Sequence, residues 1–250
     1  MTSRGNMDAR HMLLKAAMQS GCGHVPSSLS VLDIISVLYD NVLGDDDHFI
    51  LSKGHAALAL YTVLAERGLI DVSELSTMGS IESRLGGHPD RVKLRGLVET
   101  STGSLGHGLP QAVGIAIGKK IKEEPGVVYC LIGDGEALES TTMESSALAL
   151  AHRLGNLCLL VDDNGSCKSS LGVPNFKETL LAQGWNVYVA NGHDSADIER
   201  SVRGLSKETP LCVIMKTVKG KGVSEMEQDP GYWHRRIPSV EMIDRANKES

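Results

Sequence analysis

The chain has 250 residues, of which 41% are hydrophobic and 22% charged, and its formal net charge is −6 at pH 7. This composition is typical of a soluble globular protein and excludes a chain that is disordered through excess charge. The acidic balance argues against a broad nucleic-acid surface, and an aromatic content of 4% argues against stacking on single-stranded nucleic acid.

The first third of the chain has the periodicity of helices. Apolar residues recur at helical spacing in three segments, 8–20, 28–44 and 55–68, which are each followed or ended by glycine. Residues 68–105 lack such a period and contain the sequences GGHPD and ETSTGS. Connections of that length inside a compact domain are usually functional loops, so we expect part of the site to lie there.

From residue 106 onward, predicted helices and strands alternate. They are a helix at 109–121, a strand at 127–132, a helix ending near 153, strands at 157–161 and 186–190, a helix at 194–205 and a strand at 211–218. Unbroken apolar strands alternating with helices are typical of a parallel sheet that is covered on both faces. We predict an α/β fold with a doubly wound, mostly parallel sheet, in a single domain spanning 1–250 with a helical N-terminal section at about 1–67.

The cysteines and the N-terminus indicate the compartment. The five cysteines are odd in number, scattered and without a CxxC pair, which favours reduced thiols. The N-terminus has no apolar signal-peptide core, and no apolar run approaches the ~20 residues that span a bilayer. We therefore expect a cytoplasmic protein without a membrane or nucleic-acid partner.

Two loops with oxygen-bearing side chains follow predicted strands. Gly133-Asp134-Gly135 comes after the strand at 127–132, and after 27 intervening residues Asp163-Asn164 follows the strand at 157–161. Ligands bind beyond the carboxyl ends of strands in such sheets, and Mg²⁺ prefers oxygen ligands that it shares with phosphates. We predict that Asp134, Asn164 and a backbone carbonyl near Ser166 hold a metal, and that the two glycines admit a diphosphate. The alternative is that Gly133-Asp134-Gly135 is only a turn and that Asp163-Asn164 belongs only to a helix cap. Because each motif follows an apolar strand in the same way, this alternative is disfavoured.

Three histidines lie beside glycine in loops: His24, His55 and His88. A neutral imidazole in such a place can bind a sugar hydroxyl and move a proton. A zinc site is the rival interpretation, but the spacing of these histidines fits no compact ligand motif. We assign a structural or solvated role to the others: His11, His48, His152 and His193.

Seven ordered sequence blocks between about residues 20 and 238 carry a family resemblance. They are GCGHVPSSLS, FILSKGHAALALY, GGHPD, ETSTGSLGHG, GDGEALESTTME, DDNGS and KTVKGKGVSEMEQDPGYWH. In this order they resemble the N-terminal, thiamine diphosphate-binding half of transketolase. The resemblance implies thiamine diphosphate and Mg²⁺ (or Ca²⁺) as cofactors.

The resemblance also implies roles for single residues. Asp134, Asn164 and the Ser166 carbonyl would hold the metal, with the Gly135 amide on the diphosphate. The loop against the aminopyrimidine would be Gly103, Ser104 and Leu105. His55 and His234 would reach both the diphosphate and the reacting sugar, and His24 and His88 would line the substrate channel. Glu139 and Glu144 would lie near the subunit contact and link two cofactor sites, with Glu139 also counted among the cofactor-binding residues.

The resemblance implies a partner chain as well. In transketolases the glutamate that activates the cofactor lies in a second α/β domain, and this chain stops at Ser250 before any such domain. We expect one subunit of a split transketolase, with a separate C-terminal subunit carrying the pyrimidine-binding domain in an α2β2 assembly. It would transfer a two-carbon ketol unit from a ketose (phosphate), a small-molecule sugar substrate, to an aldose acceptor.

Three departures from the family pattern touch the substrate channel. Val-Pro-Ser-Ser follows His24, His107 stands where glutamine is usual, and Arg235-Arg236 follow His234 where glycine is typical. They predict an atypical sugar. A deoxyxylulose phosphate synthase-like enzyme, the α subunit of a 2-oxoacid dehydrogenase and a non-catalytic regulatory partner of the same fold stay open as alternatives, although the histidines of SKGH and GGHPD favour transketolase over the first two.

Overall fold

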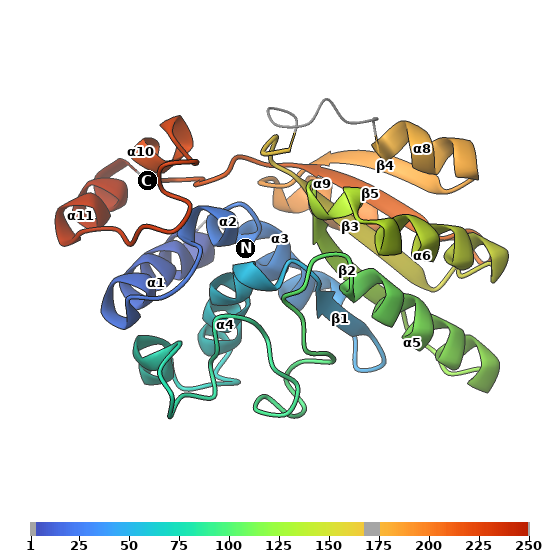
Figure 1. The fold of residues 1–250 in the computed structure, drawn as a ribbon, viewed down its shortest axis with the longest axis horizontal. Coiled ribbons are helices and arrows are strands. Elements are labelled where there is room, and N and C mark those ends of the chain that lie inside the picture. The colour runs from blue at the N-terminus through green and yellow to red at the C-terminus, as the bar shows by residue number, and fades with distance from the viewer. Residues whose placement is uncertain (1–3, 168–175, 250) are drawn as a thin grey trace.

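The computed structural model describes residues 4–167 and 176–249. Within them a five-stranded sheet forms the centre of the molecule, with helices on both sides (Figure 1). The strands are β1 (His48–Leu51), β2 (Val128–Gly133), β3 (Leu157–Asp163), β4 (Asn186–Asn191) and β5 (Leu211–Lys216). Their order is β1-β2-β3-β5-β4, and all four pairings are parallel. The predicted α/β fold is confirmed.

The helices flank this sheet in two groups. The α-helices are α1 (Arg4–Ser20), α2 (Val25–Leu29), α3 (Leu32–Val37), α4 (Ala57–Glu66), α5 (Gly108–Lys122), α6 (Ser140–Ala151), α8 (Phe176–Gln183), α9 (Ser195–Val202), α10 (Ser224–Gln228) and α11 (Val240–Glu249). Shorter turns of π- or 3-10 type are η1 (Leu38–Val42), η2 (Gly54–Ala56), η3 (Val72–Thr77) and η4 (Glu136–Leu138).

Alternate residues of the strands pack against different helices, because successive side chains of a strand point to opposite faces. On one face, Tyr129 and Leu131 of β2 pack in the same cluster as residues of α1–α4 and α9. On the other face, Cys130 and Ile132 pack with residues of α5, α6 and α8. Both faces are therefore buried along most of β2, β3 and β5, which explains the apolar runs of these strands, whereas the edge strand β4 is partly exposed.

The N-terminal section differs from the prediction in one respect. The expected helices at 8–20, 28–44 and 55–68 are present, the second divided into α2, α3 and η1, but β1 lies between them. This strand has only four residues and pairs on one side with β2, as the edge of the sheet. A short apolar run of this kind carries too little periodicity to be identified as a strand from the sequence.

The long connection at 68–105 is mostly irregular, as predicted, apart from η3. It is held to the N-terminal helices by buried apolar side chains, which are Leu75, Met78, Leu85 and Leu94. The Tyr61 hydroxyl of α4 also donates to the His88 carbonyl at 3.0 Å. The connection is therefore a packed part of the domain.

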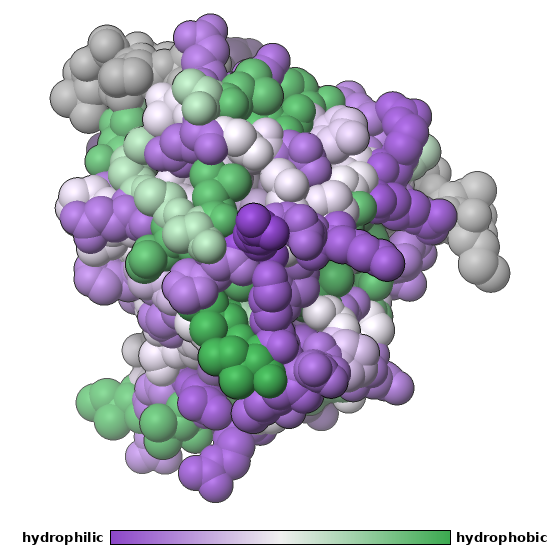
Figure 2. Space-filling model, turned by 90° about the vertical axis from the view of Figure 1, so that its right-hand side faces the viewer, coloured by the Kyte–Doolittle hydropathy of each residue, from purple (hydrophilic) through white to green (hydrophobic). Residues whose placement is uncertain are grey.

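The side of the molecule that carries α5, α6 and α8 is mixed in character. Figure 2 shows it as largely hydrophilic with separate hydrophobic patches. Each of these helices exposes a large apolar side chain, namely Ile121, Leu148 and Leu181. All five cysteines are free thiols, and no helix in the described parts of the chain is long and apolar enough to cross a membrane.

Candidate functional site

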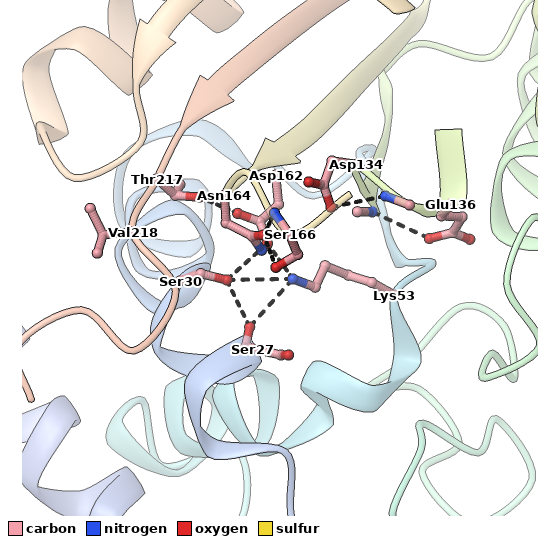
Figure 3. A network of polar contacts seen from close by, with 12 residues as sticks. Ser27, Ser30, Lys53, Asp134, Glu136, Asp162, Asn164, Ser166, Thr217 and Val218 are labelled. Atoms are coloured by element: carbon pink, nitrogen blue, oxygen red, sulfur yellow. Dashed lines mark hydrogen bonds and ion pairs between the residues drawn. The ribbon is translucent and has the colours of Figure 1, made fainter. Parts of the chain in front are cut away.

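The two predicted metal-ligand loops meet at the carboxyl edge of the sheet. Gly133 at the end of β2 pairs with Asp162 of β3, so Asp134 and Asn164 follow neighbouring strands. The loops touch directly, since the Cys167 amide donates to Asp134 Oδ2 at 2.9 Å. Figure 3 shows Asp134, Asn164 and Ser166 gathered there. The structure thus brings together the residues that the sequence analysis predicted as metal ligands.

Hydrogen bonds orient both side chains. Asn164 donates from Nδ2 to Asp162 Oδ2 at 2.8 Å, and its Oδ1 accepts from the Ser166 amide at 3.1 Å. Asp134 Oδ1 accepts from the Gly135 amide at 2.9 Å. Burial raises the pKa of Asp134, against the lowering effect of its amide donors. A carboxylate that is poorly solvated in this way is stabilised by a bound cation.

The loop around Asp134 fits a diphosphate and its metal. A Cβ atom placed on Gly133 or Gly135 would meet nothing within 4 Å, and Gly135 has an ordinary φ of −68°. Neither packing nor backbone conformation therefore requires glycine at these positions, and the space beside the loop is open to a ligand. A carboxylate, an amide oxygen and a backbone carbonyl are also the hard oxygen donors that Mg²⁺ prefers.

Three of the four predicted site histidines form a cluster. The ring centroid of His24 lies 5.6 Å from that of His55 and 4.9 Å from that of His234. His24 Nδ1 also contacts the His234 carbonyl at 3.1 Å. Burial lowers the pKa of His55 to about 2, assisted by Lys53, and lowers the pKa values of His24 and His234 as well. All three imidazoles are therefore neutral near pH 7.

The side chains of this cluster do not have the arrangement of a zinc site. In the described residues, no group of three or more His, Cys, Asp and Glu side chains is arranged to hold a metal ion. Instead, the His234 Nδ1 atom is buried and finds no hydrogen-bond partner there. Buried polar atoms are normally satisfied, so this nitrogen is suited to bind a polar group of a ligand.

His88 lies close to the loop predicted to contact the aminopyrimidine. Its own side chain is exposed. Gly103 has a φ of +144°, and a Cβ atom there would approach the His88 ring to 3.0 Å. Ser104 and Leu105 follow as exposed residues. This loop is tied to the end of β1 by the Thr102 hydroxyl, which donates to the Leu51 carbonyl at 2.7 Å.

The two predicted interface glutamates lie apart from the histidine cluster. Glu139 and Glu144 are both exposed in this single chain. A Cβ atom on Gly106 would lie 2.6 Å from Glu139 Cβ, which places Glu139 beside the 103–105 loop. Neither glutamate side chain has a described hydrogen bond to another predicted site residue. Their exposure leaves both available to a second chain.

The sequence analysis did not select four buried polar residues behind the two loops. They are Ser52, Lys53, Glu136 and Asp162. Lys53 forms an ion pair with Asp162, and the Ser52 hydroxyl donates to Glu136 (Figure 3 shows the ion pair and its surroundings). Only Asp162 has a signal in the sequence, as a charged residue at the end of an unbroken apolar strand, where an unpaired charge would be costly.

Comparisons with known proteins show the family of the chain. The model of the family "Transketolase, thiamine diphosphate binding domain" matches residues 6–232. The chain belongs to this family. An apulose-4-phosphate transketolase subunit of Phocaeicola vulgatus is 32% identical over 96% of this chain and 90% of the relative. The corresponding apulose-4-phosphate transketolase subunit of Actinobacillus succinogenes is 35% identical over 95% of this chain and 91% of the relative.

Full-length transketolases match over part of their length. Human transketolase is 34% identical over 94% of this chain, which spans 40% of the human protein. The crystal structure of transketolase from Campylobacter jejuni superimposes with a TM-score of 0.90 at 28% identity, over 100% of this chain and 43% of that chain. This transketolase-family chain therefore has the fold and family that its sequence blocks predicted.

Proposed function

We propose that this chain is the thiamine diphosphate-binding subunit of a split transketolase. Together with a separate chain, it would transfer a two-carbon ketol unit from a ketose phosphate to an aldose acceptor. One observation carries the proposal: the Asp134 and Asn164 loops meet on the sheet edge, and Lys53, which pairs with Asp162 between them, stands two residues before His55 of the histidine cluster. The proposed metal–diphosphate site and a set of neutral imidazoles would then share one end of the sheet.

Different loops of this chain would bind different parts of the cofactor. Asp134, Asn164 and the Ser166 carbonyl would bind Mg²⁺ (or Ca²⁺). The Gly135 amide, which donates to Asp134 Oδ1 in this structure, would donate to the diphosphate once the cofactor and its metal are bound. The loop of Gly103, Ser104 and Leu105 would lie against the aminopyrimidine. When bound, thiamine diphosphate supplies a nucleophilic carbon and an electron sink for cleaving a carbon–carbon bond.

The histidines would handle the sugar and its protons. A neutral imidazole has one N–H donor and one acceptor nitrogen, so it can bind a hydroxyl in either direction. His24, His55 and His234 are neutral near pH 7 because burial lowers their pKa values. His234 Nδ1 supplies an unsatisfied nitrogen, and the exposed His88 would line the entrance to the substrate channel. The departures around His24, His107 and Arg235 support an atypical sugar.

A partner chain would complete the site. Two relatives are named as one subunit of a transketolase, and Glu139 and Glu144 are exposed here. The partner would carry the pyrimidine-binding domain, in an α2β2 assembly in the cytoplasm. We expect ketol transfer to be negligible with this chain alone and to appear when the partner is added, in an assay with thiamine diphosphate, Mg²⁺ and a panel of sugars. Robust transfer by the chain alone would contradict this part of the proposal.

Calorimetry tests the cofactor site itself. Titration of the chain with thiamine diphosphate in the presence of Mg²⁺ should give a binding isotherm that disappears when Mg²⁺ is removed with EDTA. Asp134→Ala should weaken binding by roughly tenfold to a hundredfold, because it removes the only carboxylate of the proposed metal site. Asp45→Ala is the matched control, since Asp45 is an exposed carboxylate in the turn before β1. Equal affinity of the Asp134 variant and the control would refute the site.

A further inference from the structure

Ser52 and Lys53 are consecutive residues that make contacts in two directions. They directly follow β1, and both of their amides donate to the Leu131 carbonyl of β2, at 2.9 and 3.3 Å. The Ser52 hydroxyl donates to the carboxylate of Glu136, in the turn after Asp134. The Lys53 ammonium pairs with Asp162, at the end of β3 before Asn164. Two neighbouring side chains thus contact both loops of the proposed metal site.

The Ser52 contact reaches the Asp134 loop through Glu136. Glu136 is 1% exposed. Its Oε1 also accepts from the Gly106 amide at 2.8 Å, and its Oε2 from the amide of Gly133, the residue before Asp134, at 3.4 Å. Ser52 in turn accepts from the Gly108 amide at 3.0 Å. This set of bonds joins the end of β1, the start of the Asp134 loop and the start of α5.

The Lys53 contact reaches the Asn164 loop through Asp162. Both side chains of the pair are at most 1% exposed. Asp162 also accepts from Ser30 at 2.8 Å, from the Thr217 hydroxyl and from Asn164 Nδ2 at 2.8 Å (Figure 3). Because the amide nitrogen of Asn164 is bound by Asp162, its oxygen is turned away, toward Ser166. Asp162 therefore fixes which end of Asn164 faces the metal site.

We propose that Ser52 and Lys53 are positioning residues that set the separation and orientation of the two metal-ligand loops, acting through Glu136 and Asp162. The inference rests on the proposed function, because it assigns these four residues to the metal site of that function. A buried ion pair is weak evidence for stability, since a neutral pair of similar shape is often as stable. Partners behind metal ligands, in contrast, typically alter metal affinity by 10–100-fold when they are replaced.

The test measures metal affinity and stability separately. The Kd of Mn²⁺ is measured by electron paramagnetic resonance on the full chain in the presence of thiamine diphosphate, and the free energy of unfolding is measured in urea. Ser52→Ala removes the Glu136 contact. The double variant Lys53→Met with Asp162→Asn removes both buried charges together, so that no unpaired charge remains in the core. The amide that replaces the Asp162 carboxylate then has a single acceptor oxygen for three donors, Ser30, Thr217 and Asn164.

Matched controls lie in other parts of the chain. Lys119 of α5 is a buried lysine whose ammonium donates to the Asp46 carbonyl, before β1 begins. Ser146 of α6 is a buried serine that donates to Gln183. We expect Ser52→Ala and the double variant each to raise the Kd of Mn²⁺ by about tenfold or more while unfolding cooperatively, and Lys119→Met and Ser146→Ala to leave it unchanged.

The outcomes separate this inference from the proposed function. If the wild-type chain binds no Mn²⁺ with thiamine diphosphate, the proposed function itself fails. If the wild type binds and both folded variants bind as tightly, only the positioning role is overturned. An equal loss of affinity in the controls would also overturn it, because the effect would then be general. Should Ser52→Ala fail to fold, the neutral double variant still decides the Lys53 contact.

Discussion

The surroundings of the His55 imidazole shift its pKa strongly. Burial lowers its pKa from 6.5 to about 2, and the neighbouring Lys53 acts in the same direction. The folded chain therefore keeps His55 neutral at pH values where the unfolded chain protonates it. In the proposed site it would be a neutral hydrogen-bonding group throughout the physiological range.

The pH dependence of stability tests this environment. Below pH 6.5 the unfolded state binds a proton at His55 that the folded state does not bind, so the free energy of unfolding decreases as the pH falls. Between pH 7 and 5.5 this amounts to on the order of 1 kcal/mol for one such group. His55→Asn should lose this part of the slope in urea unfolding, whereas His152→Asn, at an exposed position, should keep it. Parallel slopes for wild type and His55→Asn would contradict the assignment.

At the residue scale, the sequence singled out the candidate ligand-facing groups but not the buried polar groups behind them. Asp134, Asn164 and the histidines stand beside glycine or in polar loops, so their pattern marks them as accessible. Lys53, Glu136 and Asp162 are buried and charged, which average preferences disfavour. Only the three-dimensional pairing of Lys53 with Asp162 shows how the burial of these two charges is tolerated. No spacing rule links residues that are 109 positions apart.

At the element scale, strand ends position the site. Strands β2 and β3 were predictable because their apolar runs are long and end in oxygen-bearing loops. The edge strand β1 was not, although it places Ser52 and Lys53 behind the two loops and leads directly to His55. Its four residues are stabilised by pairing with β2, a tertiary contact that local sequence does not report. The sequence-based prediction therefore misses an element where pairing between distant segments, rather than local sequence, determines the structure.

The His193 side chain shows a second tertiary contact of this kind. It was assigned to the structural or solvated histidines, and it lies between Asp33 of α3, at 2.7 Å, and the Val218 amide, which donates to its Nε2 at 2.9 Å. Asp33 also accepts from Arg10 of α1 at 3.3 Å. These bonds fasten the segment after β5 to the N-terminal helices, so that His234 at the far end of that segment can reach His24.

At the scale of the whole molecule, this chain matches one part of full-length transketolases. It spans 40% of human transketolase but 90% of a relative that is named as a transketolase subunit. The exposed Glu139 and Glu144, and the apolar side chains exposed on α5, α6 and α8, are surfaces that a further chain could cover. We infer that the metal–diphosphate site is formed within this chain, and that the pyrimidine side of the cofactor is completed by the partner.

The most direct measurement is a crystal structure of the chain grown with thiamine diphosphate and Mn²⁺, with data collected at the manganese absorption edge. We expect an anomalous peak between the Asp134 carboxylate and the Asn164 amide oxygen, with the diphosphate against the Gly135 amide. Cofactor bound at another place, or Asp134 and Asn164 turned apart with no metal between them under saturating concentrations, would contradict it.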